Sequence, residues 1–87
     1  MSQASRIAGI ILETLAETGN RPVPEGQVYA AFMGHMDLST FQSIIGAMVD
    51  GGLAERRAGP CIVATADGLD IGQRLLAARA ASKAVAS

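Results

Sequence analysis

Apolar residues recur at helical spacing near the start of the chain and predict a first helix over residues 5–18. At 100° per residue, one face of this helix carries Ile7, Ile11, Thr14, Leu15 and Thr18. Ile10 and Leu12 flank that face on opposite sides, and Glu13 points away from it. Gly19 and Asn20 predict the end of the helix, because both residues tolerate the left-handed conformation of a helix stop.

The prolines at positions 22 and 24 predict a stiff, extended linker over residues 21–25. A second helix is then expected to begin at residue 24 or 25, since proline and an acidic residue both suit a first turn. It should run to about Met33 and end at Gly34. Its inner face is expected to carry Val28, Ala31 and Phe32.

A third helix is predicted from Ser39 to Asp50, followed by a Gly51-Gly52 stop. Ser39 with Gln42 three residues later has the pattern of a capping box, with Ser39 as the N-cap. The apolar side of this helix holds Phe41, Ile44, Ile45, Met48 and Val49. Its opposite side holds Thr40, Gln42, Ser43, Gly46, Ala47 and Asp50.

Two strand-like runs follow, over residues 53–57 and 61–65, and residues 58–60 should join them as a tight hairpin. Thr65 can cap a last helix that has Asp67 in its first turn. The alanine-rich tail over residues 77–87 is either part of one long helix or a fraying end. The sequence therefore predicts one domain over residues 1–87, mainly α with a small β-hairpin, in the order helix, helix, helix, hairpin, helix.

Composition agrees with a small globular domain, since 49% of the 87 residues are hydrophobic. The net charge of −1 gives no overall attraction to nucleic acid. The charge is uneven, with two arginines against five acidic residues in residues 1–50 and five basic against three acidic residues in 51–87. A single cysteine allows no intrachain disulfide, and no signal peptide or membrane span is evident, so a cytoplasmic protein is expected.

The order of elements resembles the winged helix-turn-helix domain of bacterial regulators of the MarR and PadR type. The resemblance rests on the Ser39-Thr40 start, the strand Gly52-Leu53-Ala54-Glu55-Arg56, and the segment over residues 64–68, and it covers roughly residues 6–76. It implies a DNA-binding regulator whose third helix lies in the major groove and whose wing arginines contact the backbone or minor groove. Carried over to this chain, the DNA-facing positions are Ser39, Thr40, Gln42, Ser43, Arg56 and Arg57. The chain departs from the family where basic residues are often found, because it has Ser43 and Ala47 there and adds Asp50.

Each of these positions also has a purely structural interpretation. Arg56 and Arg57 could be solvated hairpin residues, one of them paired with Glu55. Ser39 and Gln42 fit helix caps, which leaves Thr40 and Ser43 as the uncommitted polar side chains.

No combination of residues predicts catalysis, a metal site or a cofactor. The only histidine, His35, and the only cysteine, Cys61, lie far apart in sequence, and Cys61 is expected to be a packing residue. No phosphate-binding glycine loop and no paired acidic residues of a catalytic site are present, so the protein is not expected to be an enzyme.

A protein interface is expected on two surfaces. Small side chains at Gly46 and Ala47 would let another backbone approach the third helix. The last helix has a second apolar side, which together with the first helix suggests a two-fold homodimer. The residues expected in protein contacts are Ile10, Leu12, Gly46, Ala47, Ile71, Leu75 and Ala78.

Two functions remain open from sequence. The first is a dimeric regulator that binds double-stranded DNA. The second is a winged-helix interaction module that binds another protein and not DNA, favoured by the acidic first half and the uncharged outer side of the third helix.

Overall fold

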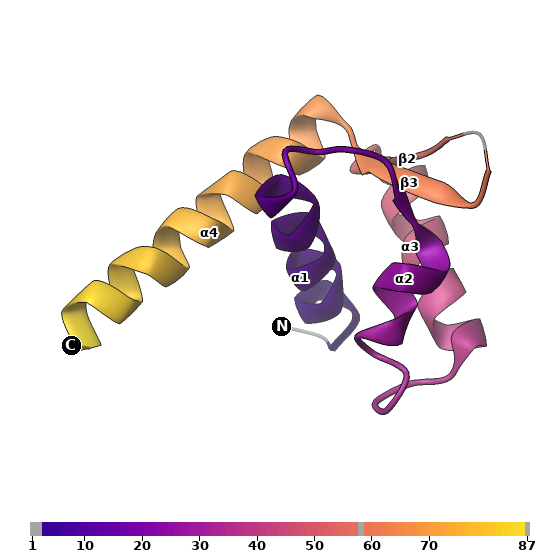
Figure 1. Ribbon diagram of the computed structural model, residues 1–87, viewed down its shortest axis with the longest axis horizontal. Helices are drawn as coiled ribbons and strands as arrows, with labels where there is room; N and C mark the ends of the chain where they lie inside the picture. Colours follow the sequence, from indigo (N-terminus) through magenta and orange to yellow (C-terminus); the bar gives the residue numbers. More distant parts are fainter. Residues whose placement is uncertain (1–2, 58, 87) are drawn as a thin grey trace.

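The described part of the chain, residues 3–57 and 59–86 of a computed structural model, is mainly helical with a small three-stranded antiparallel sheet (Figure 1). The elements in order are α1 (Gln3–Glu17), β1 (Val23–Pro24), α2 (Glu25–Ala30), α3 (Leu38–Asp50), β2 (Ala54–Arg57), β3 (Cys61–Ala64) and α4 (Ala66–Ala86). The predicted helices and hairpin are therefore present, with β1 added. Ala58 of the predicted hairpin connection and Ser87 of the predicted tail lie outside the described residues.

The predicted linker proves to contain a strand. Val23 and Pro24 pair antiparallel with Ile62 and Cys61, which gives the sheet order β1-β3-β2. Proline has no backbone N–H to donate, and β1 is an edge strand where this loss is tolerated. The predicted extended conformation and the start of the second helix at residue 25 are confirmed, but the pairing of β1 with β3 was not predicted, because two residues carry no readable alternation of apolar and polar side chains.

One apolar core lies between α1, α3 and the sheet. The side chains that are almost completely enclosed are Ile11, Leu12, Leu15, Phe41, Ile45 and Ile62. The predicted apolar sides of α1 and α3 are confirmed in Ile7, Ile11 and Leu15 and in Phe41, Ile44, Ile45 and Met48, although Thr14 and Thr18 are exposed. Leu12 is only 2% exposed and belongs to this core.

Helix α2 is shorter than expected, since it ends at Ala30 and not near Met33. Residues 31–36 form turns, in which Phe32 N–H donates to the carbonyl of Tyr29 and the Tyr29 hydroxyl donates to the carbonyl of Met36. The Tyr29 and Phe32 rings lie 5.2 and 6.3 Å from the ring of Phe41. Aromatic packing therefore fixes the turn where helical hydrogen bonding stops. Ala31 is exposed and contributes no inner face.

Two glycines of α4 allow close backbone contacts, Gly72 where α4 crosses α1 and Gly68 against the segment before β2. A Cβ atom at Gly68 would collide with the carbonyl of Leu53, and one at Gly72 would collide with the carbonyl of Leu12. The sequence shows these glycines only as weak points in a helix, whereas in the structure they let two backbones approach. Beyond this crossing α4 continues away from the sheet (Figure 1).

Glu13 corrects another expectation, because it faces α4 and not solvent. Its residue is 6% exposed, and its carboxylate lies 2.6 Å from the guanidinium of Arg79. Burying a carboxylate without a counter-charge would be strongly unfavourable, so this ion pair ties the second half of α4 to α1.

Candidate nucleic-acid interface

The third helix begins one residue earlier than predicted and has a different cap. Asp37 is the N-cap, and its carboxylate accepts a 2.9 Å hydrogen bond from the backbone N–H of Thr40. Hydrogen bonds from the Thr40 side chain and then from its backbone hold the pKa of Asp37 below its usual value. The predicted capping box of Ser39 and Gln42 is therefore wrong. The Asp37 carboxylate accepts from the backbone N–H of Thr40 as an N-cap does, and Ser39 lies inside the first turn of the helix.

With the cap at Asp37, the polar side chains of α3 that form hydrogen bonds within the protein are the opposite of those expected from the sequence. Ser43 donates its hydroxyl to the carbonyl of Ser39 at 3.1 Å, and the Thr40 side chain bonds to Asp37. The hydroxyl of Ser39 and the amide of Gln42 make no hydrogen bond to any other residue in the described ranges. All four predicted DNA-facing side chains of α3 are exposed, and the two without a partner are Ser39 and Gln42.

Thr40 and Ser43 lie at the edge of this outer side and line an open hollow of about 680 Å³. Its other walls come from α3, from the turn over residues 35–37 and from the start of α1, through Ile44, Ala47, Gln3, Ala4 and Ile7. Gly46 lies elsewhere on the helix, and nothing is found within 4 Å of a Cβ built there. The outer side of α3 is therefore small, polar and uncovered by other described elements, with Asp50 as its charged residue.

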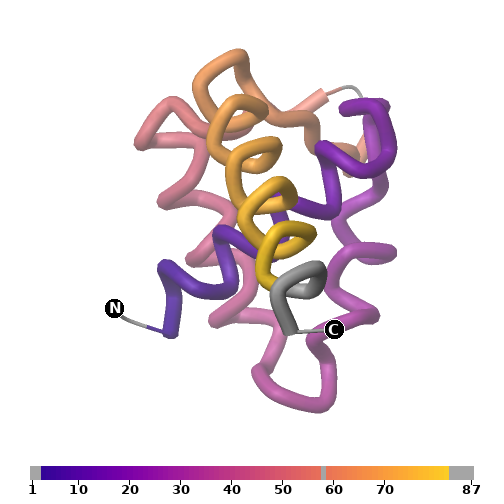
Figure 2. Tube along the Cα trace, turned by 90° about the vertical axis from the view of Figure 1, so that its left-hand side faces the viewer, coloured from indigo at the N-terminus to yellow at the C-terminus, as the bar shows by residue number. Residues whose placement is uncertain are grey.

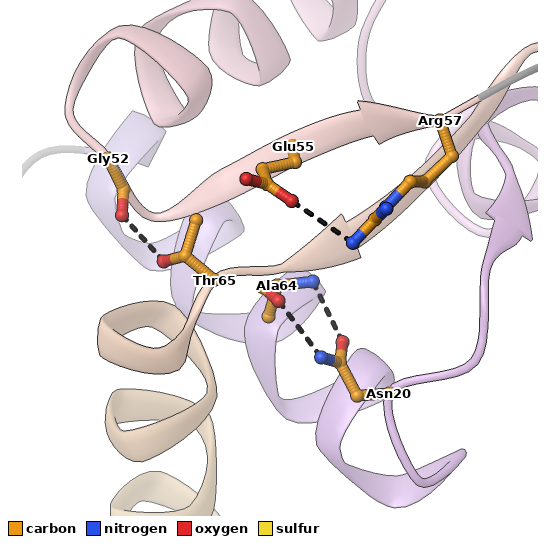
Figure 3. Close-up of polar contacts among 6 residues, drawn as sticks. All are labelled: Asn20, Gly52, Glu55, Arg57, Ala64 and Thr65. Carbon is orange, nitrogen blue, oxygen red and sulfur yellow. Dashed lines mark hydrogen bonds and ion pairs between the residues drawn. The ribbon is translucent and has the colours of Figure 1, made fainter.

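The hairpin points its two arginines in opposite directions, as successive strand residues do. Arg56 stands opposite the buried Ile62 and reaches Glu25 at the start of α2, with Nε 3.5 Å from the carboxylate. Arg57 lies on the other face and pairs with Glu55 at 3.2 Å (Figure 3). The pairing with Glu55 that the sequence allowed is thus observed for Arg57. The two guanidinium groups do not form one patch.

Arg57 belongs to a small surface that sequence reasoning missed. Its side chain lines a hollow with Asn20, Pro22 and Val63. Arg21, between Asn20 and Pro22 in the chain, is exposed and has no ion pair to another described residue. Arg21 directly precedes the two prolines of the predicted linker, and nothing in the sequence indicated that its charge would lie beside the hairpin.

Asn20 fixes this segment to the sheet. Its side-chain amide donates to the carbonyl of Ala64 at 2.9 Å and accepts from the N–H of Ala64 at 2.8 Å (Figure 3). Directly after Ala64, at the same open end of the hairpin, the Thr65 hydroxyl donates to the carbonyl of Gly52 at 2.6 Å and caps α4 by accepting from Gly68 N–H at 3.1 Å. The predicted Thr65 cap is confirmed, and both side chains hold the hairpin in place.

The residues predicted for protein contacts do not form one surface. Ile10 is exposed but lines a hollow with Val28 and Phe32 of the α2 region, whereas Ile71 and Leu75 face a different hollow between α1 and α4. Leu12 is buried and not accessible to a partner. Ala78 is exposed on α4, beyond the crossing with α1.

Within the described ranges, no group of three or more His, Cys, Asp or Glu side chains is placed to hold a metal ion, and Cys61 is half-buried. No described helix is both long enough and apolar enough to cross a membrane. Comparison of the chain with known protein families, with curated proteins and with solved structures found no match.

Proposed function

We propose that the chain is a winged-helix DNA-binding regulator, with the outer side of α3 in the major groove and the hairpin beside it. The observation that carries the proposal is α3 itself. It is capped at Asp37, packed along one side, and free of other described elements along the opposite side. The hairpin that carries Arg56 and Arg57 follows directly. A helix about 10–12 Å across with its side chains fits a major groove about 12 Å wide.

Base contacts fall to the side chains without internal partners. The amide of Gln42 can form the two hydrogen bonds that adenine offers in the major groove, and the Ser39 hydroxyl can bond to a base or a phosphate. Thr40 and Ser43 retain acceptor capacity but already donate within the helix. Asp50 on the same side repels phosphate and limits how closely the end of α3 can approach DNA.

Phosphate contacts fall to Arg57, with Arg21 added to the predicted set. Both are exposed, and the ion pair of Arg57 with Glu55 joins two half-exposed side chains, so a phosphate can replace the carboxylate. Arg56 is held toward Glu25, whose own Oε1 is buried without a hydrogen bond, and is the less available of the wing arginines.

A mobility shift with genomic DNA fragments at low salt tests the proposal, and retarded complexes are expected. Arg57→Ala should weaken them, while Arg57→Lys, which keeps the charge at the same position, should largely preserve them. Glu55→Gln should strengthen binding by up to about fivefold, because it removes a carboxylate that competes for Arg57 with about 1 kcal/mol at most. The absence of any retarded DNA for the wild-type protein would reject the proposal.

A second function is favoured by the charges on the same surface. The outer side of α3 has no lysine or arginine, and both wing arginines pair with acidic residues. These features suit a winged-helix module that binds another protein through Gly46 and Ala47, where a partner backbone could approach. In that case the mobility shift shows no DNA binding for either the wild type or Glu55→Gln. Ala47→Arg, which places a large charged side chain on the outer side of α3, should abolish binding of the protein partner.

A further inference from the structure

We propose that Glu25 restrains Arg56 in an autoinhibitory contact, so that the hairpin binds DNA more weakly than its two arginines would allow. The inference rests on the proposed DNA binding and deepens it, because it names a residue that opposes that binding. The start of α2 lies beside the hairpin in Figure 1 and again in Figure 2, where both are behind α4. Glu25 is the first residue of α2, and its carboxylate lies 3.5 Å from Nε of Arg56.

The backbone brings Glu25 to the hairpin. Val23 and Pro24 of β1 pair with β3, so the residue that follows them begins α2 at the edge of the sheet. The backbone N–H of Glu25 donates a 2.6 Å hydrogen bond to the carbonyl of Pro60, in the turn of the hairpin. Glu25 therefore contacts the hairpin through its backbone as well as its side chain, and a change of side chain leaves the backbone contact in place.

Strand alternation turns Arg56 toward α2. Arg56 stands opposite Ile62, whose side chain is buried, whereas Arg57 lies on the other face of the hairpin. The side chain of Arg56 is still 51% exposed, so a phosphate can reach the guanidinium without unfolding of the hairpin. Arg56 can therefore pair either with the carboxylate of Glu25 or with a phosphate of DNA.

The carboxylate of Glu25 depends on its arginine more than that of Glu55 does. The side chain of Glu25 is 24% exposed, against 56% for Glu55. Oε1 of Glu25 is enclosed and accepts no hydrogen bond from the described part of the chain. If Arg56 turned to a phosphate, this oxygen would lose its counter-charge while it is shielded from water, which is unfavourable. The contact with Glu25 therefore competes with DNA for Arg56.

Fluorescence anisotropy with a DNA fragment recovered from the mobility shift tests the proposal in four proteins: the wild type, Glu25→Gln, Arg56→Ala and the double variant. Glutamine removes the charge but keeps the backbone hydrogen bond and nearly the same shape. Glu25→Gln should raise DNA affinity by about fivefold, which is the most that a partly exposed ion pair usually contributes. The salt dependence should also steepen by about one for each bound copy, because Arg56 becomes free to contact a phosphate.

The double variant shows whether Glu25 acts through Arg56. Arg56→Ala should lower affinity by less than about twofold in the wild type, where the arginine is restrained, but by about fivefold in Glu25→Gln. Glu25→Ala also keeps the backbone hydrogen bond and should give the same gain as Glu25→Gln, so it replaces the glutamine variant if circular dichroism shows that variant to be unfolded.

Glu17→Gln is the matched control. Glu17 is exposed at the end of α1 and has no ion pair to another described residue, so its replacement removes the same charge away from the hairpin. A gain from Glu17→Gln as large as that from Glu25→Gln would overturn the proposal, because net charge would then explain both. Equal affinity of the wild type and Glu25→Gln for DNA would overturn the autoinhibitory contact and leave the proposed function intact. Failure of all these proteins to bind DNA would reject the proposed function, and the inference with it.

Discussion

Asn20 provides the sharpest test of how the hairpin is held. Strand β1 pairs with β3 only at Ile62 and Cys61, so Ala64, which pairs with Ala54 of β2 on one side, has no strand on its other side. The Asn20 amide takes that place, because it offers one donor and one acceptor to the backbone of Ala64, as a strand residue would. Its own backbone has φ 59°, a left-handed conformation that asparagine tolerates better than most residues.

Replacing Asn20 with alanine removes both hydrogen bonds and places a less tolerant residue in the left-handed region. Two hydrogen bonds at about 1 kcal/mol each, and about 1 kcal/mol for the backbone, give an expected loss of about 3 kcal/mol. Asn20→Gly keeps the backbone conformation accessible and should lose only about 2 kcal/mol, from the hydrogen bonds.

Urea denaturation followed by circular dichroism measures both variants against the wild type. The expected order of stability is wild type, then Asn20→Gly, then Asn20→Ala. A loss below about 0.5 kcal/mol for Asn20→Ala would refute the role of the two hydrogen bonds. A glycine variant as unstable as the alanine variant would refute the contribution from the backbone conformation.

Three further predictions concern the helices. Arg79→Met should lower the free energy of unfolding by about 2 kcal/mol, because it leaves the Glu13 carboxylate buried and unpaired. In urea denaturation, the double variant Arg79→Met with Glu13→Gln should lose less stability than Arg79→Met alone. Equal losses for the single and the double variant would contradict a buried charge at Glu13. Gly72→Ala should destabilise by more than about 2 kcal/mol because α1 must move, whereas Gly46→Ala, with open space around it, should be neutral or stabilising by up to about 1 kcal/mol in thermal melts. The lowered pKa of Asp37 means that its stabilising effect is present above the unfolded pKa of about 3.9 and is lost as pH falls through the folded value. As pH is lowered, the free energy of unfolding of the wild type should therefore fall more than that of Asp37→Asn. Curves of stability against pH that run parallel for the two proteins would argue against the cap.

The helices could be predicted from sequence because each has a continuous apolar side and clear stops. Helix α1 is determined by residues close together in the chain, namely Ile7, Ile11 and Leu15 on its apolar side and Gly19-Asn20 at its end. Glu13 was misplaced because its burial depends on Arg79, which is distant in sequence and reaches it only once α4 has packed on α1. The role of Gly72 was invisible for the same reason, since a close helix crossing is a property of two segments.

The candidate site shows the same division. Exposure of Gln42 and Ser43 followed from the apolar side opposite them, but which side chains remain without partners depended on the cap at Asp37. The resemblance placed both Arg56 and Arg57 on the wing, facing DNA, whereas strand alternation separates them and brings each to a different glutamate. The local sequence pattern therefore predicts which residues are exposed, whereas contacts formed in the folded protein determine which of their side chains have hydrogen-bond or ion-pair partners.

The salt dependence of duplex DNA binding tests the proposed function most directly. Fluorescence anisotropy with a fragment recovered from the mobility shift should give a logarithm of affinity that falls linearly with the logarithm of salt concentration. Arg57→Ala should reduce this slope by about one for each copy that binds, while Arg57→Lys should leave it nearly unchanged. The proposal would be contradicted by an affinity that does not change with salt, or by a slope that is the same in the wild type and in Arg57→Ala.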